Sequence, residues 1–140
     1  MTNPPLSAEA MQAIMDGSPF IRFHQMTVEG CDPAAGTVTV AMPYRPELER
    51  GEGTGQFHGG AIASLIDTAG DFALVMGLGG GVPTINFRVD YLRPAIGQRL
   101  VATATVRRAG RTVGVVDVDV IDAQNKLVAV GRGTYSTTVG

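Results

Sequence analysis

The feature that most constrains the fold of this 140-residue chain is one long apolar segment from about Gly59 to about Leu78. Its apolar residues cover most of the circumference of a helical wheel, which is typical of a helix buried on nearly all sides. Glycines at position 77 and at positions 79–81 mark its end. Such a helix needs other elements, from this chain or from a second copy, packed around it.

One stripe of this helix is different from the rest. Gly60, Ser64, Asp67 and Asp71 follow one another at steps of four, three and four residues, so they share one helix face. Ionised carboxylates rarely lie on a buried helix without a partner or a task. The stripe therefore either faces solvent or a neighbouring loop, or belongs to a functional site.

The start of the helix, at His58-Gly59-Gly60, also has chemical meaning. A helix N-terminus offers free backbone N–H groups and partial positive charge, and glycine lets a ligand approach closely. This arrangement suits a carbonyl oxygen that gains negative charge during acyl transfer. The alternative interpretation is a glycine-rich turn in which His58 only caps the helix.

The spacing between these two features predicts an oligomer. Gly59 and Asp67 are eight residues apart, which places their backbones roughly 12 Å apart along a helix. If both belong to one active site, the Asp must come from a second copy lying antiparallel to the first. A two-fold dimer provides this arrangement and contains two equivalent sites.

The rest of the chain predicts an α+β fold in a single domain over residues 1–140, with a core from about residue 20 to about residue 138. A short helix is expected at about residues 7–15, with Ser7 as its N-cap, and Thr37–Met42 alternates like a strand. Four further strands are expected after the long helix, which gives an antiparallel sheet packed on one dominant helix. These strands are Thr84–Leu92, Arg99–Arg107, Thr112–Ile121 and Leu127–Ser136.

Composition excludes several other classes of protein. A formal net charge of -2 argues against a nucleic-acid partner held by bulk electrostatics. The single Cys31 cannot form an intrachain disulfide, and no Cys/His cluster indicates a metal site. No signal-peptide pattern is present, and Asp67 and Asp71 interrupt the apolar run, so we expect a cytoplasmic protein and no membrane span.

Three segments together resemble the PaaI-like branch of the hotdog-fold thioesterases, the group that includes phenylacetyl-CoA thioesterase. They are His58-Gly59-Gly60 followed by Asp67 nine positions after the His, the run from Asp90 to Ala95 that contains Tyr-Leu-Arg-Pro, and the run 106–112. The resemblance extends from about residue 51 to about residue 135. It implies a long central helix wrapped by a curved antiparallel sheet, dimers with a continuous sheet, and often tetramers.

The resemblance also implies an activity and residue roles. The reaction would be hydrolysis of an acyl or aryl-acyl coenzyme A to free acid and CoA, with CoA as part of the substrate and no separate cofactor. The Gly59 N–H would polarise the thioester carbonyl and His58 would help to orient it. Asp67 of the facing protomer would be the general base or the nucleophile. Thr84 lies where relatives carry a Ser or Thr that steadies the water or the carboxylate.

One position departs from the family pattern. Relatives often have Asn six positions before the His, where this chain has Glu52. An ionised carboxylate accepts a hydrogen bond from water but cannot donate one. Glu52 is therefore either a second acid-base group or an exposed loop residue.

Basic residues near two turns are candidates for binding the CoA phosphates. Arg93 precedes a proline at a strand end, and Arg107, Arg108 and Arg111 flank the turn at Ala109-Gly110. The alternative for all four is ordinary solvation of a turn. The acyl group would need an apolar pocket near the helix start, for which the candidates are Phe57, Ile62, Leu65 and Met76.

Two other functions stay open from the sequence. A hotdog hydratase or dehydratase would use a His with an acid for proton transfer at carbon, although the spacing of His58 to Asp67 fits the hydrolase pattern better. A non-catalytic acyl-CoA-binding protein is the second alternative, because Glu52 replaces the usual Asn.

Overall fold

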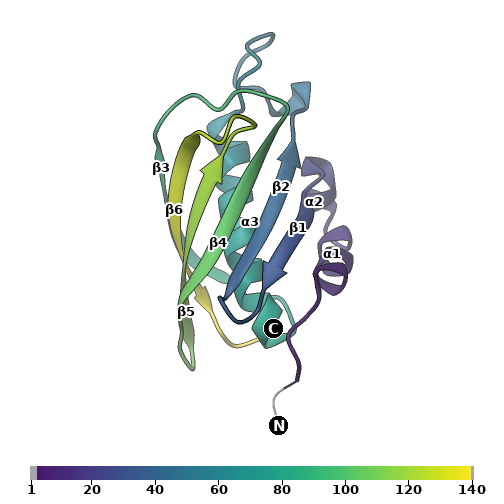
Figure 1. Ribbon diagram of the computed structural model, residues 1–140, viewed down its shortest axis with the longest axis vertical. Coiled ribbons are helices and arrows are strands. Elements are labelled where there is room, and N and C mark those ends of the chain that lie inside the picture. The colour runs from purple at the N-terminus through teal and green to yellow at the C-terminus, as the bar shows by residue number, and fades with distance from the viewer. Residues whose placement is uncertain (1–2, 140) are drawn as a thin grey trace.

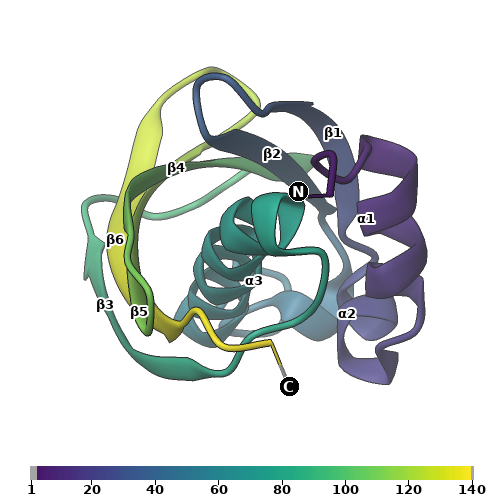
Figure 2. The same ribbon diagram turned by 90° about the horizontal axis from the view of Figure 1, so that it is seen from below.

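A computed structural model describes residues 3–139 and contains a six-stranded antiparallel sheet curved around one long helix (Figures 1 and 2). The expected α+β hotdog arrangement is therefore confirmed. The elements in chain order are α1 Ala8–Asp16, α2 Pro19–His24, β1 Thr27–Asp32, β2 Thr37–Pro43, the 3-10 helix Pro46–Leu48, α3 Gly59–Leu78, β3 Thr84–Tyr91, β4 Arg99–Ala109, β5 Val113–Ile121 and β6 Leu127–Ser136.

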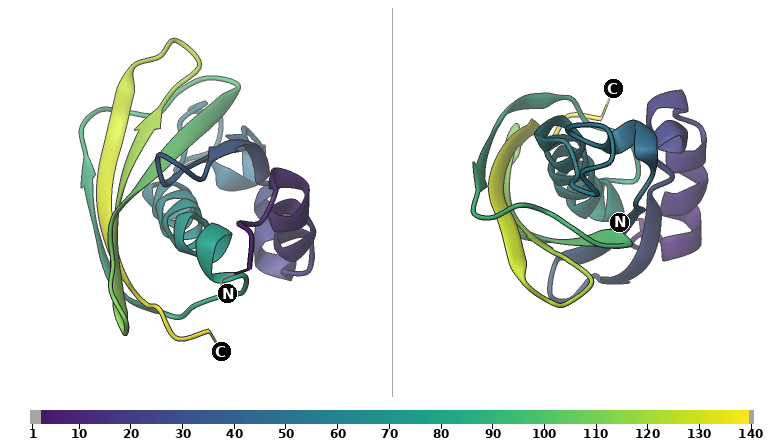
Figure 3. Two further views of the ribbon diagram at one scale, coloured as in Figure 1. Left: turned by 60° about the horizontal axis from the view of Figure 1, so that its bottom comes forward. Right: turned by 90° about the horizontal axis from the view of Figure 1, so that it is seen from above.

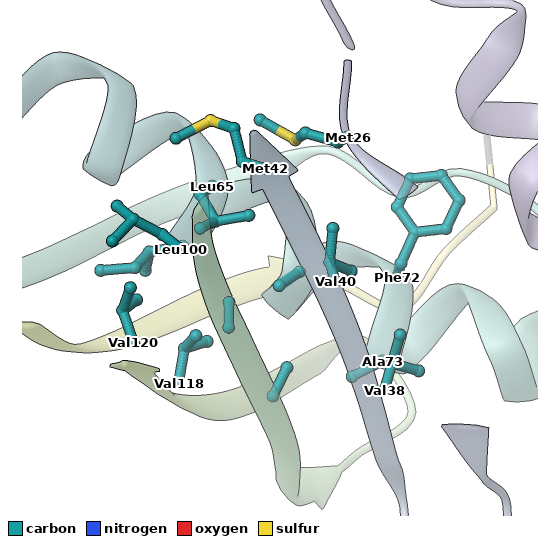
Figure 4. Packing of buried hydrophobic residues seen from close by; sticks show 14 of the residues in the cluster. Met26, Val38, Val40, Met42, Leu65, Phe72, Ala73, Leu100, Val118 and Val120 are labelled. Atoms are coloured by element: carbon teal, nitrogen blue, oxygen red, sulfur yellow. The ribbon is translucent and has the colours of Figure 1, made fainter. Parts of the chain in front are cut away.

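The helix α3 is the centre of the hydrophobic core. Figure 4 shows Val40 and Met42 of β2 and Leu100 of β4 in the cluster that contains Leu65 of α3. By length and composition alone α3 could cross a membrane. Its burial inside the curved sheet identifies it instead as a core helix.

Glycines in β6 allow the sheet to approach this helix. A Cβ atom on Gly131 would lie 2.6 Å from Cγ2 of Ile66 in α3. Because real Cβ atoms do not come so close to another carbon, the contact requires a residue without a side chain. This close approach fixes where α3 lies over the sheet.

The N-terminal region confirms one prediction and corrects another. Ser7 caps α1, since its Oγ accepts a hydrogen bond from the Ala10 N–H at 3.1 Å. The sequence prediction of one strand before α3 was wrong, because β1 precedes β2 and the short helix α2 precedes β1. Pro19 occupies the first turn of the short helix α2, where its missing N–H is tolerated. In β1 a register shift at Val28/Gly30 obscures the alternation that marks a strand.

The two edges of the sheet differ. The strand order is β1-β2-β4-β5-β6-β3, so β1 and β3 are the edges. The helix α1 lies along β1, and its Gln12 side chain accepts from the Val28 N–H at 2.7 Å and donates to the Met26 carbonyl at 3.2 Å. Within residues 3–139, no strand pairs with the outer edge of β3. One edge is thus closed by the chain itself and the other is open.

Candidate active site

The first turn of α3 leaves one backbone donor free. His58 is the N-cap, and its Nδ1 accepts from the Gly60 N–H at 2.7 Å. The Ala61 and Ile62 N–H groups donate to the His58 carbonyl at 3.0 and 3.3 Å. Among the first four amides of the helix, only that of Gly59 has no acceptor within residues 3–139. This N–H is therefore available at the positive end of the helix dipole.

The cap also determines which nitrogen of His58 carries a proton. Because Nδ1 accepts a hydrogen bond, the ring is neutral with its proton on Nε2. The His58 side chain is exposed, so its Nε2–H can donate to a bound molecule. The structure shows that His58 caps the helix. The cap leaves its Nε2–H free to donate, so the functional interpretation of the His-Gly-Gly run stays open.

The strand β3 anchors this helix start. The Tyr91 hydroxyl donates to the Gly59 carbonyl at 2.7 Å, and a Cβ on Gly59 would lie 3.2 Å from the Tyr91 ring. Two of the segments behind the family resemblance are therefore in direct contact. Sequence reasoning did not find this role for Tyr91, because the contact joins residues 32 positions apart.

A pocket of about 340 Å³ opens beside Gly59. Of the four candidates for an acyl pocket, Phe57 and Ile62 line it, whereas Leu65 and Met76 lie in the core. Arg93 also lines this pocket. The pocket thus combines an apolar wall, a free amide and a positive charge.

Further along α3, Asp67 is held by two hydroxyl groups. The Thr84 Oγ1 donates to Oδ1 of Asp67 at 2.8 Å, and the Tyr135 hydroxyl donates to the Asp67 carbonyl at 3.1 Å. Tyr135 is fully buried, and its ring occupies the space where side chains on Gly70 and Gly133 would otherwise be. Thr84 therefore contacts the carboxylate directly, as the resemblance led us to expect, and Tyr135 fixes the helix turn that bears it.

Asp71, one helical turn after Asp67, was seen in the sequence only as part of the polar stripe. Burial, and secondarily the charge of Asp67, raises the pKa of the Asp71 carboxyl from 3.8 to about 7, against the opposing effect of the Val82 N–H. No Lys or Arg within residues 3–139 forms an ion pair with either carboxyl group. The middle of α3 therefore presents two acids that no cation neutralises.

Within one protomer the free amide and the acid do not meet. Both lie on the continuous helix α3, and eight residues separate their backbones by roughly 12 Å. The side chain of Asp67 cannot bridge that separation to a carbonyl bound at Gly59. Each protomer thus carries the free amide and the acid at different places along α3.

The four candidate arginines fall into two groups. Arg93 lies at the Gly59 end, whereas the turn between β4 and β5 lies at the opposite end of the sheet (Figure 1). Arg108 is near the end of β4, and Arg111 is in this turn. Eight residues of β4 separate Arg99 from Arg107, or about 26 Å at about 3.3 Å per residue. Arg107 pairs with Asp117 at 3.5 Å. Of these four arginines, only Arg93 lines the Gly59 pocket of its own protomer, which Arg50 lines as well.

Glu52 lies in the loop that precedes α3. The right-hand view of Figure 3 shows the molecule from the end where this loop lies. Its residue is exposed, and it has no hydrogen-bond partner within residues 3–139. Glu49 organises this loop instead, accepting from the Gly53 and Gly55 N–H groups at 3.3 and 2.6 Å. Inside a single protomer, Glu52 therefore behaves as an exposed loop residue.

Comparison with known proteins supports the same family. The sequence profile of the Thioesterase superfamily matches residues 54–129. The protein VNG_1336C of Halobacterium salinarum is 39% identical over 140 residues, covering 92% of this chain and 91% of that protein. Human acyl-coenzyme A thioesterase 13 is 35% identical over 105 residues, covering 72% of this chain and 73% of its own length.

The third relative is similar in both sequence and structure. Acyl-coenzyme A thioesterase PaaI of Escherichia coli is 41% identical over 78 residues, and the match covers 54% of each chain. The structure of E. coli PaaI superimposes with a TM-score of 0.81 at 26% identity, covering 96% of this chain and 98% of that one. The fold, the arrangement at the start of α3 and these similarities agree: this chain belongs to the thioesterase superfamily, in its PaaI-like hotdog branch.

Proposed function

We propose that this protein is an acyl-CoA thioesterase that hydrolyses acyl or aryl-acyl coenzyme A in a site shared by two protomers. The observation that carries the proposal is the pairing, on one helix, of a free Gly59 amide beside an apolar pocket and a Thr84-bound Asp67. The names of two relatives, PaaI and acyl-coenzyme A thioesterase 13, support the substrate class.

The open edge of β3 supports a dimer. Ile85, Phe87 and Tyr91 of this strand expose 55%, 37% and 53% of their surface, which is unusual for large apolar residues beside an unpaired strand edge. Pairing of β3 with its two-fold copy would extend the sheet, cover these side chains and bring the two α3 helices side by side in antiparallel orientation. A homodimer is thus the minimum assembly, and a tetramer of two dimers is the assembly that the family resemblance suggests.

In such a dimer the two halves of the site complete each other. The thioester oxygen accepts hydrogen bonds from the Gly59 N–H and from His58 Nε2, which stabilise the charge that develops on it. Asp67 of the other protomer, held by its own Thr84, either takes a proton from the attacking water or attacks the carbonyl carbon itself. The C–S bond then breaks and the thiolate leaves. Where Asp67 is the nucleophile, water then hydrolyses the acyl–Asp67 anhydride, which releases the free acid and restores the carboxylate. The reaction as proposed consumes water and requires no cofactor.

Arg93 is the arginine that the proposal assigns to the CoA phosphates of its own protomer's pocket. A second pocket, of about 550 Å³, is lined by Arg93 as well and adds Lys126. With the acyl group in the apolar Gly59 pocket, the CoA phosphates would extend past Arg93 toward Lys126, and both side chains are positively charged. Arg107, Arg108 and Arg111 could act only across the dimer, where antiparallel packing brings the far end of one protomer toward Gly59 of the other.

The test is a thiol-release assay over a panel of acyl-CoAs with the unaltered protein and with Asp67→Ala. We expect turnover of at least one class of acyl-CoA, its loss in the variant, and the same oligomer by size-exclusion chromatography. Full hydrolysis by Asp67→Ala would refute the assignment of Asp67. Hydration of a crotonyl thioester would indicate the hydratase alternative, and tight acyl-CoA binding without thiol release would indicate a binding protein.

The single domain over residues 1–140 and the cytoplasmic location stay predictions from the sequence.

A further inference from the structure

Asp71 is a half-buried acid that the mechanism above does not use. It lies on the same face of α3 as Asp67, one turn further along. Three groups from the surrounding elements face this pair: the buried Tyr135 hydroxyl of β6, the backbone N–H of Val82 before β3, and the Thr84 hydroxyl of β3.

None of these groups is a cation, and they form different hydrogen bonds with the two acids. Thr84 donates directly to a carboxylate oxygen of Asp67, whereas no side-chain hydroxyl within residues 3–139 donates to the carboxyl group of Asp71. Tyr135 donates to the Asp67 backbone, so its hydroxyl proton is not available to Asp71. Two carboxylates one helical turn apart, without a cation, do not both ionise readily, so one of them retains a proton.

We propose that Asp67 and Asp71 form an acid pair that carries one proton near neutrality, in which Asp71 holds the proton and Asp67 holds the charge. Asp71 is then a positioning residue, because it acts on the substrate only through Asp67. The proposal rests on the function proposed above for Asp67. The burial of Asp71 and its pKa of about 7 agree with this division of roles.

The pair predicts a particular pH dependence. As the pH rises through 7, Asp71 loses its proton and places a second negative charge one turn from Asp67. A neighbouring negative charge makes a carboxylate a stronger proton acceptor, and a stronger base or nucleophile reacts faster. Asp71→Asn removes this transition and keeps the size of the side chain.

The kinetic test compares kcat/KM of the unaltered protein, Asp71→Asn and the control Asp119→Asn between pH 6 and pH 8.5. Asp119 is exposed and lies with the charged residues of a different pocket. We expect kcat/KM of the unaltered protein, divided by kcat/KM of Asp71→Asn, to rise about three- to tenfold over this range. The same ratio taken with Asp119→Asn should stay constant. A constant or falling ratio for Asp71→Asn would overturn the proposal.

A second measurement needs no turnover and separates this inference from the proposed function. Carbon-13 NMR of labelled aspartate carboxyls follows the titration of Asp71 in the unaltered protein and in Asp67→Asn. We expect a midpoint near pH 7 that moves to lower pH when Asp67 is neutral. A midpoint that Asp67→Asn leaves in place contradicts the pair, even if the protein hydrolyses acyl-CoA. A shifted midpoint in a protein that hydrolyses no acyl-CoA would keep the pair and reject only the function.

Discussion

The first turn and the middle of α3 belong to one helix yet have opposite chemistry. The first turn presents donors, namely the free Gly59 amide and the Nε2–H of His58, beside an apolar pocket. The middle presents acceptors, the carboxyl groups of Asp67 and Asp71, beside hydroxyl groups of β3 and β6. Acyl transfer needs both kinds of group around one carbonyl.

Because the donors and the acids lie apart on α3, one chain alone cannot form the proposed site. If the donors and the acids were adjacent in one protomer, they would hydrogen-bond to each other and leave nothing for a substrate. Their separation of roughly 12 Å along the helix keeps both free. In the proposed dimer, an antiparallel copy would bring the Gly59 amide of one protomer next to Asp67 of the other.

The largest effect is expected from removing the acid in the middle of the helix. Asp67→Asn should lower kcat by about a thousandfold or more, since a base or nucleophile contributes a factor of about 10²–10⁴. Thiol release with the best acyl-CoA of the panel measures it. KM should change much less than kcat. A variant that retains more than a tenth of the activity would exclude Asp67 from the reaction.

The next effect comes from removing the donor in the first turn. Gly59→Pro deletes the amide hydrogen at a helix position where proline is well tolerated, and His58 already has the extended backbone that a residue before proline prefers, with φ -63° and ψ 141°. Loss of one oxyanion donor should cost about 10²–10³ in kcat.

Gly59→Ala is the matched control for this change. It adds a side-chain carbon near the Tyr91 ring, as proline does, but keeps the N–H. The difference in kcat between the two variants isolates the amide. Equal activity of Gly59→Pro and Gly59→Ala would show that the free amide has no part in catalysis.

A third prediction concerns the effect of Asp71, in the middle of α3, on the stability of the fold. The pKa of Asp71 is raised in the folded protein from 3.8 to about 7, so its protonated form stabilises the fold at pH values below about 4, and this contribution is lost as the pH rises through 7. Asp71→Asn should therefore raise the free energy of unfolding at pH 8 by up to about 4 kcal/mol, because each unit of the shift from 3.8 to about 7 corresponds to about 1.4 kcal/mol. Urea unfolding at pH 8 and pH 4 measures this, with little difference expected at pH 4. An equal effect at both pH values would contradict the raised pKa.

The smallest effect is expected at Thr84. Thr84→Val keeps the shape and removes the hydroxyl that donates to Asp67. A hydrogen bond to a charged group contributes about 1.5–3 kcal/mol, so we expect kcat to fall about tenfold, and Thr84→Ser should retain most of the activity. If valine and serine behave alike, the hydroxyl does not position the carboxylate.

Local patterns predicted one part of this molecule well. The bounds of α3, the common face of its polar stripe and the four strands after it follow from helical and strand periodicity, which depend on neighbours in the chain. The donor at Gly59 and the acid at Asp67 were predictable for the same reason. The strand β1 was not, because its register shift disturbs the alternation.

Contacts between distant residues could not be predicted. Tyr91 reaches Gly59 across 32 positions and Tyr135 reaches Asp67 across 68, and no short spacing signals either contact. Asp71 was visible in the stripe, but its raised pKa depends on burial that only the fold creates. Likewise the sequence could not show that Arg93 and the arginines near Gly110 lie at opposite ends of the sheet.

The central claim is that each active site takes Gly59 from one protomer and Asp67 from the other. It is tested most directly by co-expressing Gly59→Pro and Asp67→Asn chains with different tags and isolating the mixed dimers. In such a dimer one site carries both changes and the other carries neither. We expect two nearly inactive parents to give a mixed dimer with about half the activity of the unaltered dimer. Mixed dimers no more active than their parents would contradict it.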